Sequence, residues 1–338
     1  MQRFTSLFAA GLLLAVGVST VRADKIELTG TLRDFKMSTQ AGGHPDFENT
    51  GNGQYPLVTG MVQSGLGADM KPVLNNSPLT TTVSLSSSTK ITSVTLKFAD
   101  NTTQAFTSLS TTSGTWPSSP STKSIKSVAV VLKGSSTSYT LTDGSTHTAT
   151  TNGITATFAV SENIPTGWRV SSVASFKQWY TNVTGVNQSI PYTIVLDNGA
   201  TNPGGTYTFE ASKHNGVSFF PLDGQCFGNQ GQSHNYSFTY EIATKFTYTA
   251  RSTRNADMVF NFSGDDDVWV YINHKLVVDL GGVHPEQYAS VNVDSLASQL
   301  GLVAGQTYDF NIFYAERHTT ESNCTIQTTI QFLSPLYD

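Results

Sequence analysis

Residues 263–284 read SGDDDVWVYINHKLVVDLGGVH, and this stretch decides how the rest of the chain is interpreted. A glycine and three consecutive acids are followed by two runs with the alternation of β-strands, Val268–Ile272 and Leu276–Leu280. Asn273-His274 separates the two runs where a tight turn is needed. We therefore predict a β-hairpin whose first strand fixes the direction of the carboxylates in front of it.

The three acids are Asp265, Asp266 and Asp267. Neighbouring carboxylates repel each other unless a cation or hydrogen bonds compensate their charge. Calcium prefers oxygen ligands, and carboxylates are the commonest charged ones. The acids therefore suggest a calcium site on the rim of a β-structure. The alternative is that they only cap a turn at the start of a strand.

The first residues have the pattern of a secretory signal peptide. A positive start that includes Arg3 precedes the apolar run Leu7–Val18, and the small residue Ala23 follows it. The run is too short to be a good membrane span, and no second run approaches membrane length. We expect the mature chain to begin near Asp24 and the protein to be secreted, without membrane insertion. The mild net charge of −5 argues against nucleic acid as a partner.

Cys226 and Cys324 are the whole cysteine inventory. An isolated pair in an oxidising compartment is expected to form a disulfide, and two buried thiols are the alternative. Zinc is implausible because neither cysteine belongs to a close ligand pair. Sequons fit the same compartment and permit N-glycosylation without proving it. The six candidates are Asn101, Asn182, Asn187, Asn235, Asn261 and Asn323.

From about Ser77 to Val173 the chain becomes rich in Ser and Thr and poor in acids. Regularly spaced apolar alternations such as Ile91–Phe98 and Ile125–Leu132 predict a small β-sandwich. A disordered O-glycosylated stalk is the alternative, but it would lack these alternations. A short capped helix is predicted at Asp294–Gly301, and one or two helical turns at Phe176–Val183.

Several motifs together resemble the fibro-slime domain, which is similar to the larger protective-antigen-type β-barrel family. The resemblance covers about residues 29–73 and 176–332, and it leaves the Ser/Thr-rich segment outside, as an insertion or a divergent part of the barrel. Besides residues 263–284, the motifs are RDF at 33–35, HPDFE at 44–48, GMVQSGLGADMKPV at 60–73, WYTNVTGVN at 179–187, SFFPLDG at 218–224, HNYSFTYE at 234–241 and YAERHTTESN at 314–323.

The resemblance implies an all-β fold: a protective-antigen-type β-barrel or sandwich with an inserted or adjoining Ser/Thr-rich β-sandwich. The expected organisation has four parts. They are a signal peptide at 1–23, a first part of the fibro-slime domain at 24–76, the Ser/Thr-rich β insertion at 77–173 and the main part of the domain at 174–338.

The resemblance also implies how calcium would be held. Lectin relatives bind it with two consecutive Asp joined by a cis peptide, and Asp265 and Asp266 match that pair by their position before Val268. A non-proline cis bond costs about 3 to 4 kcal/mol, so a bound cation would help to hold it. Asp267 stands third, where relatives outside the fibro-slime branch often have Gly, and this leaves the register of the pair open by one residue.

His284, Glu316 and His318 are further ligand-binding candidates, together with Asp267, because loops at strand ends gather at one rim. The ordinary explanation for such residues is loop hydrogen bonding and salt bridges. A polysaccharide hydrolase would need two acids flanking the bond, which Glu316 or Glu321 with one Asp could supply. However, no nucleophile motif such as G-x-S-x-G is present.

We therefore predict a secreted carbohydrate-binding or cell-surface adhesion protein, calcium-dependent and non-catalytic. Its expected partner is a glycan or polysaccharide, or a cell-surface protein. One alternative is a secreted signalling or matrix component that binds a protein partner through the same domain. The other is a polysaccharide hydrolase.

Overall fold

The computed structural model describes residues 25–49, 56–76, 79–118, 123–144, 146–199, 205–212 and 218–333. The predicted signal peptide at 1–23 lies outside these residues. Within them, no helix is long and apolar enough to cross a membrane. Nearly all regular structure is β, which confirms the predicted all-β class.

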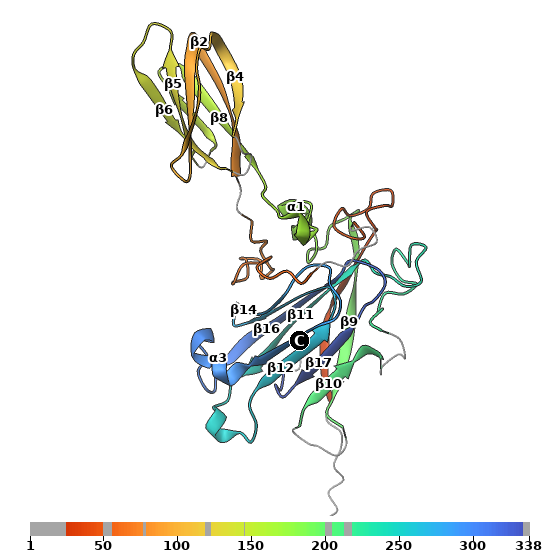
Figure 1. Ribbon diagram of the computed structural model, residues 1–338. Helices are drawn as coiled ribbons and strands as arrows, with labels where there is room; N and C mark the ends of the chain where they lie inside the picture. The colour runs from red at the N-terminus through yellow and green to blue at the C-terminus, as the bar shows by residue number, and fades with distance from the viewer. Residues whose placement is uncertain are drawn as a thin grey trace, which may run out of the picture.

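Ten strands form the larger sheet, in the order β14-β13-β16-β11-β1-β9-β10-β17-β12-β15, with antiparallel pairing throughout (Figure 1). The strand bounds are β1 (Lys25–Phe35), β9 (Asn187–Asp197), β10 (Tyr207–Glu210), β11 (Phe238–Thr247), β12 (Val259–Gly264), β13 (Asp267–Ile272), β14 (Lys275–Leu280), β15 (Gln287–Asn292), β16 (Thr307–Glu316) and β17 (Cys324–Thr328).

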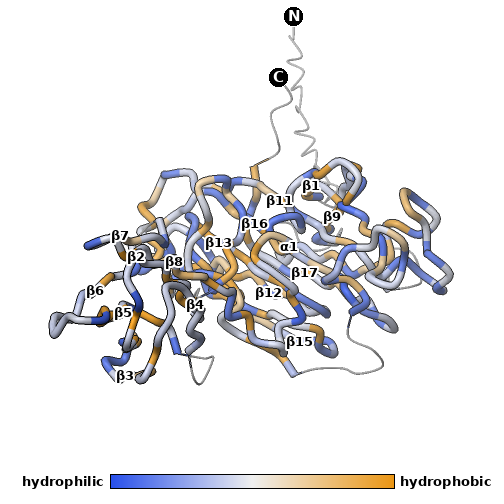
Figure 2. The backbone as a smooth tube through the Cα atoms, turned by 90° about the horizontal axis from the view of Figure 1, so that it is seen from above, coloured by the Kyte–Doolittle hydropathy of each residue, from blue (hydrophilic) through white to orange (hydrophobic). Residues whose placement is uncertain are grey.

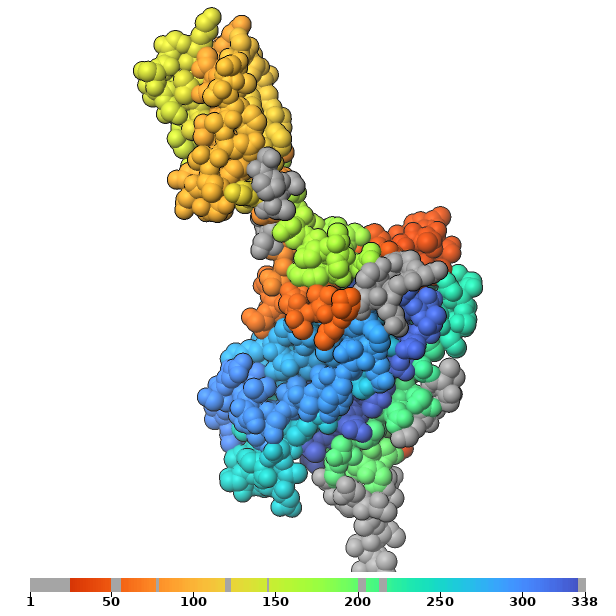
Figure 3. Space-filling model, viewed as in Figure 1, coloured from red at the N-terminus to blue at the C-terminus, as the bar shows by residue number. Residues whose placement is uncertain are grey.

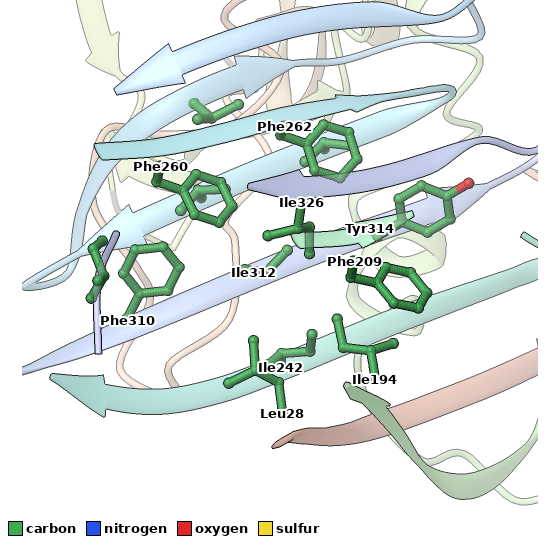
Figure 4. Close-up of a cluster of buried hydrophobic side chains, with 14 of the residues drawn as sticks. Leu28, Ile194, Phe209, Ile242, Phe260, Phe262, Phe310, Ile312, Tyr314 and Ile326 are labelled. Carbon is green, nitrogen blue, oxygen red and sulfur yellow. The ribbon is translucent and has the colours of Figure 1, made fainter. Parts of the chain in front are cut away.

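The curved sheet encloses one hydrophobic core to which all ten strands contribute. Figure 4 shows Phe260 and Phe262 of β12 facing Ile312 and Tyr314 of β16, with Ile326 of β17 between them. These residues alternate along their strands, as the sequence pattern requires for an inward face. The core therefore fixes the ends of β12, β13, β16 and β17, from which the acidic stretch and its neighbours project.

The predicted hairpin at residues 268–280 is confirmed. β13 pairs with β14 across Asn273 and His274, which have φ values of 48° and 63°. Two residues at positive φ are what the favoured two-residue hairpin turn requires. β13 is buried along its whole length because its two faces meet different cores.

The outer face of β13 and β16 is covered by a second cluster, which contains Trp179, Trp269 and Tyr271. The cover consists of the chain after β1 and of α1 (Val173–Lys177), which lie over the barrel in Figure 3. Residues 60–73 form only isolated bridges in this cover rather than the two short strands that their sequence suggests. Trp269 is fully buried and donates from Nε1 to Asp279, so it is a core residue and not a sugar platform.

The Ser/Thr-rich segment folds as a separate sheet with its own core. The first half of β2 pairs with β8 and β4, and its second half pairs with β5 and β3, so that the two halves line opposite sides of one core, as in a sandwich. Figure 2 shows both hydrophilic and hydrophobic residues along these strands. The strand bounds are β2 (Leu79–Phe98), β3 (Thr103–Phe106), β4 (Thr111–Pro117), β5 (Ile125–Leu132), β6 (Ser138–Thr142), β7 (Thr148–Thr151) and β8 (Ile154–Ser161).

The helices are short. α3 (Val293–Leu300) is capped by the Asn292 side chain and ends at Gly301 with φ 74°, which confirms the predicted helix to within a residue. α1 begins earlier than predicted, because Ser172 and Ser175 form a capping box that starts the helix there. Two 3₁₀ turns, η1 (Thr166–Trp168) and η2 (Arg251–Thr253), also occur.

The predicted disulfide is wrong, because both cysteines are free. Cys324 begins β17 and its side chain packs in the barrel core, where it is 6% exposed. Cys226 is exposed in the loop between β10 and β11, next to the buried Asp34. An inward-facing strand residue and an exposed loop residue do not present their thiols to each other.

Candidate functional site

Asp265 follows β12 directly and is held by a single partner residue, Asn323. The Asn323 backbone N–H donates to Oδ1 at 2.5 Å, and its side-chain amide donates to Oδ2 at 2.9 Å. Gly264 is required in front of Asp265 because a Cβ atom there would overlap the carbonyl oxygen of Asn323. The sequence indicated Asn323 only as a sequon, and no local pattern marked its contact with Asp265.

Asp266 accepts hydrogen bonds from two backbone N–H groups, those of His284 at 3.2 Å and Arg317 at 2.9 Å. Asp267 begins β13 and forms an ion pair with the Arg317 guanidinium, from Nε at 2.5 Å. Its other oxygen accepts from the Gly282 N–H at 2.6 Å. The structure thus brings all three acids to one end of the barrel and gives Asp267 the one cationic partner among them.

Burial dominates the electrostatics of this cluster. It raises the pKa of Asp265 to about 6 and also raises the pKa of Asp266 and of Asp267. Glu316, at the end of β16, is fully buried as well, so its pKa is raised by burial and then by the carboxylates of Asp266 and Asp265. Asp265, Asp266 and Glu316 therefore form a buried group of acids, and the Arg317 guanidinium, which favours the ionised form of Asp266, makes its ion pair with Asp267.

His284 lies beside the acids but its ring does not bind them. Its Nδ1–H donates to the carbonyl of Pro285 at 2.9 Å, and the buried Nε2 atom has no partner in the described structure. Burial lowers the pKa of His284, which keeps the imidazole neutral.

His318 contacts Glu48, a residue that the sequence did not single out. Its Nδ1 lies 3.0 Å from Oε2 of Glu48, and the Thr319 N–H donates to Oε1 of the same glutamate at 2.6 Å. Nearby Asp46 is buried and accepts from Trp179 Nε1 at 3.0 Å and from the Ser171 N–H at 2.7 Å. The two acids of HPDFE, Asp46 and Glu48, therefore connect the cover to the barrel through hydrogen bonds rather than lying free in solvent.

The acidic stretch does not have the metal-site geometry that the resemblance implies. Among the described residues, no group of three or more His, Cys, Asp or Glu side chains is arranged to hold a metal ion. The implied cis peptide between Asp265 and Asp266 is wrong, because the cis bond in the described chain is Thr319–Thr320. The oxygen donors of Asp265 and Asp266 nevertheless fit the chemistry of a hard cation such as calcium.

An open pocket of about 610 Å³ adjoins Asp265 through the Asn323 side chain. The rings of Phe220 and His234 stack there at 3.9 Å and 7°, and Tyr236 meets the Phe220 ring edge-on. Its lining is completed by polar residues from three loops: Ser218, Ser233, Glu286, Thr320, Glu321 and Asn323. Ring faces beside hydroxyl, amide and carboxylate groups are suited to a polar ring-shaped ligand.

The sequons differ in what their side-chain nitrogens do. Those of Asn187, Asn235 and Asn323 donate hydrogen bonds inside the protein, to Thr181, Asp34 and Asp265 respectively. Asn101 and Asn182 are exposed, and Asn261 is half-buried on β12.

Comparison with known proteins places this site within a recognised domain type. Residues 232–334 match the family model of the PA14 domain. PA14 domains are of the carbohydrate-binding and adhesion type, which is compatible with a non-catalytic binding role.

The curated relatives come from Dictyostelium discoideum. Protein psiQ is 42% identical over 183 residues, which cover 50% of this chain and 17% of psiQ. Protein psiR is 41% identical over 182 residues, with the same coverages, and protein psiC is 37% identical over 177 residues, covering 50% of this chain and 31% of psiC. The chain therefore corresponds to less than a third of the length of these relatives.

Two of the solved structures that match do so over less than a third of the chain. The PA14 domain of the MpAFP antifreeze protein covers 28% of this chain and 43% of its own length, at 11% identity and a TM-score of 0.20. The GH31 alpha-xylosidase from Xanthomonas citri covers 29% of this chain and 10% of its own, at 11% identity and a TM-score of 0.19.

Proposed function

We propose that this chain is a secreted, calcium-dependent glycan-binding or adhesion protein of the fibro-slime type, without catalytic activity. The observation that carries the proposal is the open polar pocket with a stacked aromatic wall, whose lining residue Asn323 also donates to the buried Asp265. The PA14 match over the segment that contains most of this site supports the carbohydrate class.

Calcium would be held by Asp265 and Asp266, with its remaining ligands from backbone carbonyls, water and hydroxyl groups of the sugar. Two observations support a cation there. Both acids are almost fully buried, and among the described residues neither forms an ion pair, because Arg317 makes its ion pair with Asp267. A divalent ion would supply the missing positive charge and favour the ionised carboxylates.

A hydrolase is less well supported. Glu316 has no exposed surface and contacts Tyr314 and the backbone of His318, so it does not face a polysaccharide in this structure. The alternative ligand, a protein, would bind at the same rim, and the retention test described next distinguishes it from a glycan.

The test is retention on a glycan array with calcium or with a chelator, combined with calorimetric titration of calcium. We expect retention in calcium, loss with chelator, and loss of both readouts in Asp265→Asn/Asp266→Asn. Asp100→Asn, which alters an exposed acid on the Ser/Thr-rich sheet, is the matched control. Unchanged retention and calcium affinity in the folded double variant would refute the metal site, and binding to cell-surface protein alone would refute the glycan.

A further inference from the structure

The charges around the pocket beside Asp265 restrict the ligand that it can accept. Its described lining contains the carboxylates of Glu286 and Glu321, both on exposed residues, and neither lysine nor arginine. The one histidine, His234, lies with Nδ1 2.6 Å from Oδ2 of Asp223. An incoming ligand therefore meets an excess of negative charge.

The geometry of the pocket adds a second restriction. Phe220 and His234 stack face to face, and Tyr236 closes the end of the stack with its ring at 81° to Phe220 and 84° to His234. Asp223 fixes this wall, because it accepts from the Asn235 N–H at 2.8 Å as well as contacting His234. A rigid ring face beside hydroxyl groups favours a flat, hydroxylated ring over an extended flexible chain.

We propose that this pocket binds a sugar that carries a positive charge, namely a hexosamine whose amino group is not acetylated. This inference rests on the proposed glycan-binding function and specifies its ligand class. The sugar ring would lie against the Phe220–His234 stack, and its ammonium group would approach Glu286 or Glu321. A sugar with a carboxylate or sulfate group would be repelled by the same two side chains.

The experiment compares three probes by titration calorimetry in calcium: oligomers of glucosamine, oligomers of N-acetylglucosamine, and an oligosaccharide containing glucuronate. Glucosamine oligomers should bind more tightly than the acetylated ones by about 1.5- to 5-fold for each carboxylate, the range of exposed ion pairs. The glucuronate probe should bind most weakly. High salt should remove most of the preference, because it screens exposed charges.

Glu286→Gln and Glu321→Gln remove the charges while keeping side-chain size, and both positions are exposed, so folding should be retained. We expect these variants to lose the preference for glucosamine oligomers over acetylated ones. Glu27→Gln, an exposed glutamate on β1 that does not line the pocket, is the matched control and should behave as the wild type.

Equal or tighter binding of acetylated oligomers, or an unchanged preference in the Gln variants, would overturn the charged-sugar assignment and leave glycan binding intact. A lysine-rich peptide that competes as well as the glucosamine oligomer would overturn it in favour of a protein ligand. If no sugar binds to the folded protein in any arm, the proposed function itself fails, and this inference fails with it.

Discussion

Arg317 donates from Nε to Oδ2 of Asp267 at 2.5 Å, and neither side chain is exposed. The same guanidinium donates from Nη1 to the carbonyl of Arg169 at 3.0 Å and lies 4.7 Å from the ring of Trp179. One ion pair thus joins β13, the loop after β16, and the chain that returns from the Ser/Thr-rich sheet. The third acid of the stretch serves this junction, while Asp265 and Asp266 remain beside the pocket.

Replacing Arg317 should destabilise the barrel strongly. Arg317→Met leaves the Asp267 carboxylate buried without its partner, which typically costs about 3 to 5 kcal/mol. Urea unfolding followed by tryptophan fluorescence measures the loss, because Trp179 and Trp269 are buried in the adjoining cluster.

Two comparisons make this prediction specific. Arg317→Met/Asp267→Leu removes both charges and should recover part of the loss. Lys123→Met breaks an exposed pair with Asp100 and should cost about 1 kcal/mol or less. Equal effects of Arg317→Met and Lys123→Met would contradict a structural role for the buried pair.

The local parts of this architecture could be predicted from sequence because their signals are local. Strand alternation and the Asn273-His274 pair were sufficient for the β13–β14 hairpin, since the turn type depends only on those residues. The separate sheet followed from the regular alternations between 77 and 173. Asp265 and Asp266 were singled out by family position; both are buried at one end of the barrel, and their role as metal ligands stays a prediction.

The features that could not be predicted from sequence depend on contacts between residues distant in sequence. Glu48 reaches His318 and Thr319 across the molecule, and nothing near HPDFE indicates that partner. Asp267 and Arg317 lie 50 positions apart. The disulfide prediction failed for the same reason: compartment and cysteine number favour pairing, but only the fold reveals that Cys324 faces the core and Cys226 the solvent.

Asp34 should make stability depend on pH. It accepts hydrogen bonds from the Phe227 N–H at 2.6 Å and from Asn235 Nδ2 at 2.9 Å, yet burial raises its pKa to about 7. The unfolded value is near 4, so the folded state binds the proton more tightly, and ionisation destabilises it as pH rises from about 4 to 7.

The measurement is the free energy of unfolding of wild type and Asp34→Asn across that range. The variant starts from a lower stability because an amide cannot accept both hydrogen bonds, but its decline with pH should be shallower than that of the wild type. Asp100→Asn should follow the wild type, because hydrogen bonds from Thr102 lower the Asp100 pKa to about 2 and it stays ionised throughout. Parallel curves for wild type and Asp34→Asn would show that Asp34 does not titrate in this window.

Thiol titration should separate the two cysteines. The pKa of both thiols is raised, that of Cys226 by partial burial and by Asp34, so exposure is what separates them. Cys226 is exposed and should react with a thiol reagent in the native protein, whereas Cys324 is buried and should stay unreactive until unfolding. We expect one fast-reacting thiol in native protein and two in denatured, unreduced protein. Cys226→Ser should remove only the fast reaction. If the denatured, unreduced sample contained no free thiol, the two cysteines would be disulfide-bonded, contrary to this structure.

Glycan occupancy should follow the hydrogen bonding of the sequon side chains when the chain is produced in a eukaryotic secretory pathway. N-glycosylation replaces one of the two N–H groups of the Asn side chain with a bulky sugar, so an amide that donates from both inside the protein cannot carry one in this fold. Asn187 and Asn235 each donate two such hydrogen bonds. Asn182 keeps its structural role if modified, because Arg33 uses only its Oδ1 atom, at 2.8 Å. Asn101 lies at an exposed turn with φ 64°. Glycopeptide mass spectrometry should therefore find sugar at Asn101 and Asn182 and none at the two buried amides, Asn187 and Asn235. Asn235→Gln should cost about 1 to 3 kcal/mol through lost buried hydrogen bonds, whereas Asn101→Gln should change stability by about 0.5 kcal/mol or less. Sugar on Asn235 in folded protein would be incompatible with its bond to Asp34, and it would show that the loop before β11 adopts another arrangement.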